Sequence, residues 1–357
     1  MRFIMKTKYY QDIQLFRYKS TFFWYLALVL GLIGLPAVMD DYLLSQMSFI
    51  GVYVIIGAGL MLLTGYTGQV SLGHAAFFGI GAYATAILTG HGFGLIPALV
   101  VSGFITALAG FIIGLPALRL TGLYLAIATM AFSFIVEEIL VRWESLTRGN
   151  AGMYIDSPAI GSFSIDTEMR FYYLVLVIAL LTLLAIKNII RSPAGRAMIA
   201  IRDSEVAAQS MGISLAKFKT LSFSISAFIA GLAGSLYAYK MTFINPASFG
   251  IGLSIEFLAL VIIGGLGSIH GVVYGAAFVI LLPQIIIQLS EYLPVLASIQ
   301  NALQSGLYGL MIILFILFEP MGIYGRWLKL KFYFEYFPLY KAGTFRREKK
   351  YFKAERH

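Results

Sequence analysis

The sequence contains no cysteine among its 357 residues, and only 12% of them are charged. The absence of cysteine excludes a disulfide framework, a thiolate nucleophile and a cysteine-ligated metal site. Soluble domains carry about 25% charged residues, so a charge content this low is typical of a chain that lies mostly in lipid. The mean hydropathy of +0.85 and the hydrophobic fraction of 59% agree with this reading. The composition therefore predicts a protein with many membrane spans.

The sequence also lacks the short motifs of common catalytic sites. It contains no G-x-x-x-x-G-K-[ST] phosphate-binding loop, no H-E-x-x-H zinc motif and no G-x-S-x-G nucleophile elbow. His74 and His270 each stand beside a glycine, with no second His, Asp or Glu at metal-ligand spacing. We therefore expect no catalytic residue, no ATPase site, no metal and no cofactor, with both histidines as hydrogen-bonded packing residues. A membrane enzyme that uses either histidine is a more distant alternative.

Long apolar segments fill most of the chain. A hydrocarbon core about 30 Å thick is spanned by roughly 20 apolar residues in a helix. Several segments are short or contain glycine, and the number of spans within 254–290 stays open, because Gly264–Gly271 is also compatible with a re-entrant turn. The sequence predicts an all-α integral membrane protein with about ten transmembrane helices, some of them broken by glycine. The predicted segments are 22–39, 43–63, 70–89, 95–117, 122–141, 171–190, 220–240, 254–270, 271–290 and 298–318.

Basic residues gather in three regions that flank apolar segments. Lys and Arg number five in residues 1–20, six in 187–219 and ten in 326–357, against one, two and three acidic residues. In a soluble protein the formal net charge of +9 would suggest a nucleic-acid partner. Because these clusters border membrane spans, we expect them to contact anionic membrane lipid, and we expect no nucleic-acid partner.

The placement of these clusters predicts the organisation of the chain. An even number of spans puts all three basic regions on one side, which the positive-inside rule makes the cytoplasmic side. We expect a basic cytoplasmic tail at 1–20, a polytopic membrane domain at 21–325 and a second basic cytoplasmic tail at 326–357. Within the membrane domain, loop 191–219 is expected on the cytoplasmic side and loop 142–170 on the external side.

The stretch from Gly65 to Tyr83 is glycine-rich and polar, although it lies between two apolar runs. Unpaired backbone groups are costly in hydrocarbon, so such a break is tolerated only where protein or a water-filled cavity surrounds it. We expect a helix to end near Leu63 and a new one to begin near Ser71. We predict that the break lines a solute path, and the alternative is a packing motif without solute contact. A second glycine break lies at 264–271, and Glu256 precedes it. The predicted path residues are Gly65, Tyr66, Gly68, Gln69, Ser71, Gly73 and His74 of the first break, together with Glu256, Gly264, Gly265 and Gly267.

Loop 191–219 contains the pattern of an amphipathic helix. Ser192 followed by Pro193 is typical of a helix start, and Gly212 suits its C-terminal end. We predict one helix of about five turns, with Ser214 as the cap of a second short helix. Such a helix either rests on the membrane surface or docks a soluble partner.

Three blocks of the sequence closely resemble the LivM-type permease of bacterial branched-chain amino acid importers of the ATP-binding-cassette class. The first block is the break from Gly65 to Tyr83. The second runs from Ala200 to Ala208, leads to Gly212, and continues from Ser226 to Gly234. The third runs from Ser254 to Phe257 and is followed by Gly264 to Ser268. The chain departs from the family pattern at His270 and Val272, on either side of Gly271.

This resemblance implies a non-catalytic permease subunit in the bacterial cytoplasmic (inner) membrane. It implies a homologous second permease subunit, two cytoplasmic ATP-binding subunits and a periplasmic or lipid-anchored solute-binding protein as partners. It also implies that loop 191–219 contains a coupling helix that transmits movement from the ATPase subunits. The residues that match this element are Arg202, Asp203, Glu205, Ala207, Ala208 and Gly212.

The resemblance predicts uptake of branched-chain amino acids, and two other functions stay open at this point. A permease for urea or short amides shares much of the same pattern. A self-contained ion-coupled amino acid carrier is less favoured, because the apolar segments contain few charges and those lie nearer their ends.

Overall fold

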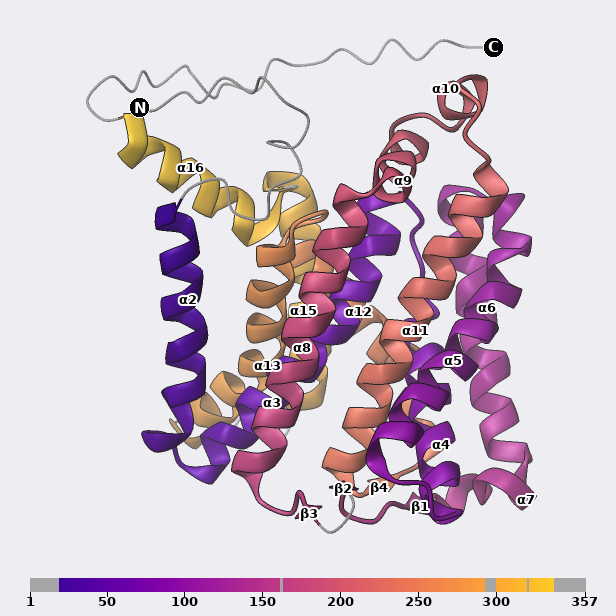
Figure 1. The fold of residues 1–357 in the computed structure, drawn as a ribbon, viewed down its shortest axis with the longest axis vertical. Coiled ribbons are helices and arrows are strands. Elements are labelled where there is room, and N and C mark those ends of the chain that lie inside the picture. The colour runs from indigo at the N-terminus through magenta and orange to yellow at the C-terminus, as the bar shows by residue number, and fades with distance from the viewer. Residues whose placement is uncertain (1–18, 161–162, 293–299, 320, 337–357) are drawn as a thin grey trace.

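The computed structural model describes residues 19–160, 163–292, 300–319 and 321–336, which form a bundle of long helices (Figure 1). Nearly all of the predicted tail 1–20 and most of the tail 326–357 lie outside the described residues. The all-α membrane fold predicted from the sequence is confirmed. Each of the ten predicted apolar segments corresponds to one helix. These are α2 (Lys19–Gly34), α3 (Asp41–Leu60), α4 (His74–Gly90), α5 (Leu95–Gly114), α6 (Gly122–Arg142), α8 (Glu168–Arg191), α11 (Leu215–Met241), α12 (Ile251–Gly264), α13 (Ile269–Tyr292) and α15 (Gln300–Phe318).

The number of full membrane spans is smaller than the number of apolar helices. Among the described residues, seven helical segments are long and apolar enough to cross a membrane, or eight if the bent pair within 306–334 counts as one. Helix α2 has 16 residues and α4 has 17, so neither reaches the roughly 20 residues that a full span requires. The expected count of about ten is therefore approximate.

Short elements connect these helices. An antiparallel pair joins β1 (Met153–Tyr154) to β4 (Phe243–Ile244), with Met153 opposite Ile244, and β2 (Ala159–Ile160) pairs with β3 (Phe163–Ser164). The connecting elements are α7 (Glu144–Thr147), α9 (Pro193–Asp203), α10 (Glu205–Ser210), α16 (Gly322–Tyr336), η1 (Leu35–Ala37), η3 (Pro116–Leu118), η4 (Gly149–Ala151), η5 (Pro246–Phe249), the π-helix η2 (Met61–Tyr66), β1 (Met153–Tyr154), β2 (Ala159–Ile160), β3 (Phe163–Ser164) and β4 (Phe243–Ile244).

The two predicted loops lie at opposite ends of the bundle. One end carries α9, α10 and α16, and the other carries α7 and the short strands (Figure 1). Loop 191–219 supplies α9 and α10, whereas loop 142–170 supplies α7 and three of the strands. The assignment of the α9–α10 end to the cytoplasm stays a prediction.

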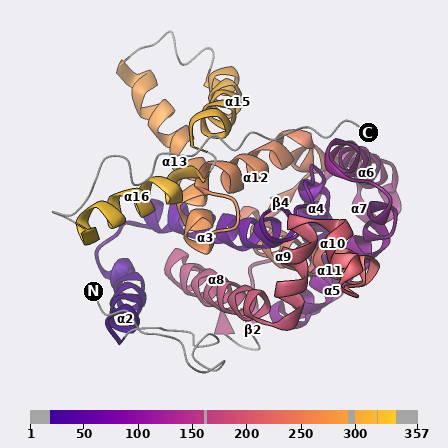
Figure 2. The ribbon, with the colours of Figure 1, turned by 90° about the horizontal axis from the view of Figure 1, so that it is seen from above.

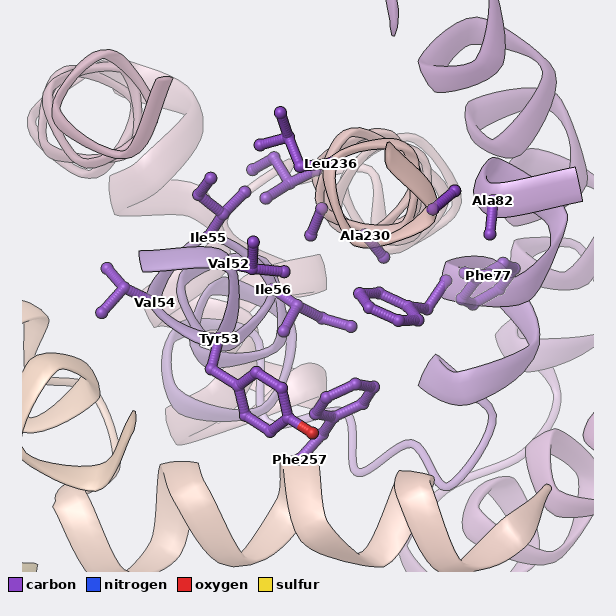
Figure 3. Close-up of a cluster of buried hydrophobic side chains, with 14 of the residues drawn as sticks. Val52, Tyr53, Val54, Ile55, Ile56, Phe77, Ala82, Ala230, Leu236 and Phe257 are labelled. Atoms are coloured by element: carbon purple, nitrogen blue, oxygen red, sulfur yellow. The ribbon is translucent and has the colours of Figure 1, made fainter. Parts of the chain in front are cut away.

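Helix α11 lies at the centre of the core. It packs against α5, α4 and α3 (Figure 2). Figure 3 shows Ala230 and Leu236 of α11 between Ile55 of α3 on one side and Ala82 of α4 on the other. All four of these side chains are buried. Among the spanning segments of the described residues, the one that contains α3 and η2 is the most buried, and α11 comes next.

Glycine allows α4 to approach α11 at backbone contact distance. A Cβ on Gly81 would lie 2.4 Å from the carbonyl oxygen of Gly231, and one on Gly234 would lie 2.0 Å from that of Phe78. Small residues bring helices together in this way in membranes, where close van der Waals contact replaces the hydrophobic effect. Gly81 belongs to the first resembling block, so part of that block packs α4 against α11. This is the kind of role that the packing alternative gives to the block.

We expect Gly234→Ala to destabilise the bundle. The added methyl group meets backbone atoms that cannot rotate away, and overpacking of this kind costs about 1–3 kcal/mol. The melting temperature of the purified protein in detergent should fall. Gly252→Ala is the matched control, because a Cβ there meets nothing within 4 Å and Gly252 lies within α12. An equal decrease in both variants would show that close α4–α11 packing is not the cause.

The second glycine break is a tight turn between two antiparallel helices rather than a re-entrant segment. Gly265 and Gly267 turn the chain with φ values of 126° and 75°. These angles are readily adopted only by glycine. A Cβ on Gly264 would lie 2.0 Å from the carbonyl oxygen of Gly271, so α12 and α13 touch along their backbones.

The helix predicted in loop 191–219 is divided into two. Ser192 caps α9 as predicted, with its Oγ accepting from the Gly195 N–H at 3.3 Å. Ser204 then adopts an extended conformation, and its Oγ accepts from the Ala207 N–H at 3.2 Å, so α10 begins as a separate helix. A serine side chain offers the backbone this alternative to a continuous helix. Ser214 caps the long helix α11 rather than a short one.

Candidate functional site

The break begins where α3 widens into the π-helix η2, a local change that is frequent at functional sites. The Thr67 hydroxyl donates to the carbonyl of Leu62 at 3.2 Å, and the Gln69 N–H donates to that of Leu63 at 3.1 Å. Gly68 then reverses the chain with a φ of 74°. The freed backbone groups are thus paired inside the protein, as a break at membrane depth requires.

Helix α4 begins at His74, three residues later than the predicted start at Ser71. The reason is that Ser71 uses its side chain to accept from the Gly73 N–H at 3.3 Å, which holds the segment before α4 in an irregular conformation. Gly73 also lies against α6, where a Cβ would be 2.6 Å from the carbonyl oxygen of Thr129. The break thus touches α6 as well as α11.

The two glycine breaks meet. A Cβ on Gly65 would lie 2.5 Å from the backbone nitrogen of Gly267 and 2.8 Å from its Cα. No side chain fits between them, although the sequence separates them by the whole middle of the chain. The backbone of one break therefore lies directly against the backbone of the other.

Arg202 joins this contact to loop 191–219. It lies near the end of α9, and its Nη1 donates to the carbonyl oxygen of Gly65 at 3.0 Å. The aliphatic part of its side chain packs on Gly68, where a Cβ would lie 3.0 Å from Cγ of Arg202. The other two guanidinium nitrogens, Nε and Nη2, donate to Oδ1 of Asp203, with Nη2 at a distance of 2.9 Å. A predicted coupling residue thus contacts two predicted path residues.

A buried ion pair joins α10 to α11. The Lys219 side chain is 1% exposed, and its Nζ lies 2.7 Å from Oε1 of Glu205, whose side chain is 37% exposed. One turn further along α11, the Ser222 hydroxyl lies 3.2 Å from Oε1 of Gln69. Within the described residues, Nε2 of Gln69 has no hydrogen-bonding partner. Polar contacts therefore run from α10 through α11 to the first break.

His74 is fully enclosed and hydrogen-bonded on both ring nitrogens. Its Nδ1 lies 3.0 Å from Oγ of Ser71, and its Nε2 lies 2.8 Å from Oγ of Ser226. Because the Ser226 hydroxyl donates to the carbonyl of Gly59 at 2.7 Å, it accepts its second bond from Nε2–H of His74. His74 thus ties α4 to α11 and, through Ser226, to α3.

His270 also contacts aromatic partners. Its Nε2 lies 2.5 Å from the Tyr25 hydroxyl, and its ring stacks on Tyr324 with centroids 5.5 Å apart. In the described part of the chain, no group of three or more His, Cys, Asp or Glu residues is placed to hold a metal ion.

The remaining predicted path residues are divided between two places. Tyr66 ends η2 at the contact between the breaks, and Gly264 ends α12 beside it. Glu256 lies eight positions before Gly264 on α12, about 12 Å along the helix axis at 1.5 Å per residue. It accepts a long hydrogen bond of 3.5 Å from the Tyr53 hydroxyl. The structure thus places Glu256 in a different site from the breaks.

Helix α10 combines a buried and an exposed side. Ala208 is buried, Glu205 points to Lys219, and Gly212 ends the turn with a φ of 80°. By contrast, Val206 is 78% exposed and Met211 is 84% exposed. Two apolar side chains therefore project from the end of the bundle.

Sequence reasoning missed Lys219, Ser222 and Ser226 as partners of the predicted residues. A signal existed for Ser226, which begins the second half of the second resembling block. A lysine inside the first turns of an apolar helix was a signal for Lys219, because such a charge needs a partner. No pattern in the sequence indicated Ser222.

The fold and site define a multi-pass helical membrane protein of the permease class, in which a loop between spans contacts a helix break that lies against a second glycine turn. The family described as "Branched-chain amino acid transport system / permease component" matches residues 42–316, and the chain belongs to this family. The resemblance stated from the three blocks is thus confirmed.

Similar proteins carry related names. The chain is 34% identical to the "High-affinity branched-chain amino acid transport system permease protein LivM" of Salmonella typhimurium over 297 residues, covering 76% of this chain and 67% of that protein. It is also 34% identical to LivM of Escherichia coli K12 over 297 residues, with the same coverage of the two chains. It is 26% identical to the permease protein LivH of Salmonella typhimurium over 307 residues, with 80% and 96% covered.

Proposed function

We propose that this chain is the membrane permease subunit of an ATP-binding-cassette importer for branched-chain amino acids. The observation that carries the proposal is membership of the permease family over residues 42–316, together with the likeness to LivM proteins. The ATP is hydrolysed on partner subunits, and this chain provides half of the conduit. The cargo crosses the inner membrane into the cell.

The partners follow from this function. A homologous second permease completes the conduit, two cytoplasmic ATP-binding subunits drive it, and a periplasmic or lipid-anchored solute-binding protein delivers the cargo. Two permease proteins with different names, LivM and LivH, are both similar to this chain, which supports a pairing of two homologous permeases.

The contacts of α9 and α10 support a route for coupling. The exposed Val206 and Met211 suit insertion into an apolar groove of an ATPase subunit, in the manner of other helix-in-groove contacts. Movement of α9 is then passed by Arg202 to Gly65, and by backbone contact to Gly267. A shift of this kind changes the side to which the path is open, provided that the ATP-bound partners favour one of the two states.

Uptake in a bacterium that lacks its own branched-chain amino acid systems tests the proposed function. The chain is expressed with its partner subunits, and initial uptake of labelled leucine, isoleucine and valine is measured beside labelled urea. ATP-dependent uptake of the amino acids is expected. Uptake of urea alone would make the chain a urea permease. Uptake by vesicles that contain only this chain, without ATP, would make it an ion-coupled carrier.

We expect Arg202→Gln to uncouple ATP hydrolysis from uptake. A hydrogen bond to a charged group is worth about 1.5–3 kcal/mol, so the loss of the bond to Gly65 should reduce uptake about tenfold. The ATPase rate of the assembled complex should persist, because its sites lie on other subunits. Arg196→Gln is the control, since Arg196 lies on the same helix and its Nη1 contacts the carbonyl of Arg191. Equal uptake in the two variants would argue against the route through Arg202.

The absence of cysteine allows the orientation to be tested with single-cysteine variants. Val206 belongs to α10 and Tyr154 to β1, which lie at opposite ends of the bundle (Figure 1), and each side chain is 78% exposed. In spheroplasts, a membrane-impermeant maleimide should label Tyr154→Cys directly and Val206→Cys only after the membrane is opened. The reverse pattern would place loop 191–219 outside the cell and would rule out its contact with cytoplasmic ATPases.

A further inference from the structure

A cavity of about 220 Å³ lies between α3, α12, α13 and α15, away from the contact between the breaks. At about 30 Å³ for each water, it has room for roughly seven waters. That is less than the 300–1,000 Å³ or so of a drug-sized pocket, and it suits a molecule about the size of an amino acid. The cavity is lined by Glu256 and Tyr53, by Gln46 and Gln284, and by apolar residues that include Val279 and Ile280.

Glu256 is the charged group of this cavity. It lies on a membrane-spanning helix, where an ionisable side chain needs a partner and indicates a functional site. Within the described residues its carboxylate pairs with no Lys, Arg or His, and it accepts one hydrogen bond, the 3.5 Å contact from Tyr53. The Tyr53 ring is held edge-to-face against Phe257 at 5.4 Å (Figure 3). The carboxylate therefore has most of its capacity to accept hydrogen bonds unused.

The cavity also offers hydrogen-bond donors. The Tyr42 hydroxyl donates to Oε1 of Gln284 at 2.6 Å, which leaves the side-chain N–H groups of Gln284 without a partner among the described residues. Gln46 adds a second side-chain amide. A carboxylate, amide donors and apolar walls in one small cavity match the three parts of a zwitterionic amino acid with an aliphatic side chain.

We propose that this cavity binds the transported amino acid during its passage, with the carboxylate of Glu256 accepting hydrogen bonds from the α-ammonium group. The amide N–H groups of Gln46 and Gln284 donate to the α-carboxylate. The side chain of the cargo lies against Val279 and Ile280. A charge-assisted bond between ammonium and carboxylate supplies the partner that Glu256 lacks. This assignment rests on the proposed function, since it takes the cargo to be an amino acid.

Binding to the assembled complex, measured without the solute-binding protein, tests this site. Labelled leucine should bind at least ten times more weakly to the complex that carries Glu256→Gln. The competitor 4-methylpentanoate, which is leucine without its ammonium group, should bind equally to the variant and to the unaltered complex. Glu138→Gln is the matched control, because Glu138 is an exposed carboxylate on another spanning helix and pairs with Arg142. This control should bind leucine normally.

The outcomes separate the site from the proposed function. Leucine import that is normal in both glutamate variants, with unchanged binding, would overturn the site and leave the function standing. If the unaltered complex imports no branched-chain amino acid, the proposed function itself fails. If Glu256→Gln does not assemble, Gln284→Leu decides the question. Both leucine and 4-methylpentanoate carry the carboxylate that Gln284 contacts, so weaker binding of both to the complex with Gln284→Leu supports the site. Unchanged binding of both to that complex overturns it.

Discussion

Gly65→Val should reduce uptake to the background level. The new Cβ would lie 2.5 Å from the nitrogen and 2.8 Å from the Cα of Gly267, so one of two backbone segments has to move. Overpacking against backbone costs about 1–3 kcal/mol or more, because no rotamer change relieves it. The contact between the two breaks would be forced apart. Uptake of labelled leucine by the complete importer measures the effect.

Gly90→Ala is the control for this variant. Gly90 is the last residue of α4, and a Cβ there meets nothing within 4 Å, so uptake should be normal. Recovery of the permease with its partner subunits shows whether Gly65→Val assembles. Normal uptake by Gly65→Val would show that the contact between the breaks is not required for transport. Loss of assembly together with uptake would favour the packing role of the break over the path role.

Glu205→Ala should destabilise the protein by about 3 kcal/mol, since it leaves the ammonium of Lys219 buried without its partner. The Lys219 side chain is 1% exposed, so water does not replace the lost carboxylate. Less protein should reach the membrane, and its melting temperature in detergent should fall. Glu205→Gln keeps a hydrogen-bond acceptor and should lie between Glu205→Ala and the unaltered chain.

The double variant Glu205→Ala with Lys219→Met distinguishes stability from coupling. Replacing both members of a buried ion pair by apolar groups is often neutral for stability, so folding and assembly should recover. If Glu205 also transmits movement from the ATPase subunits, uptake stays low in the recovered protein. If uptake recovers with stability, Glu205 acts only by neutralising Lys219. If Glu205→Ala alone is as stable as the unaltered chain, the pair does not hold α10 to α11.

Much of the fold could be predicted because each signal was local. The apolar segments predicted ten helices, and Ser192 with Pro193 predicted the start of α9. The prediction of one continuous helix in loop 191–219 was wrong, because Ser204 can either continue a helix or cap a new one and the sequence does not distinguish the two. The second break was left open between a re-entrant segment and a turn, since both require glycine.

The candidate site was predictable in its parts and not in its arrangement. Gly65, Gly267 and Arg202 were all named from the sequence, yet their contact depends on how three distant segments pack. Glu256 was grouped with the second break because both belong to the third resembling block. Along α12, however, it lies apart from the second break, and Tyr53 and Gln284 surround it from other helices.

Composition and sequence pattern alone established a multi-pass helical membrane protein, and the resembling blocks identified its permease family. These conclusions depend on local properties, namely apolar length, glycine, capping residues and charge placement, which act within a few turns of chain. Packing of the helices established the rest, including the Gly65–Gly267 contact, the bond from Arg202 and the pair of Lys219 with Glu205. It also formed the cavity around Glu256. Such contacts join residues far apart in sequence, and their geometry is set only when helices approach at backbone distance.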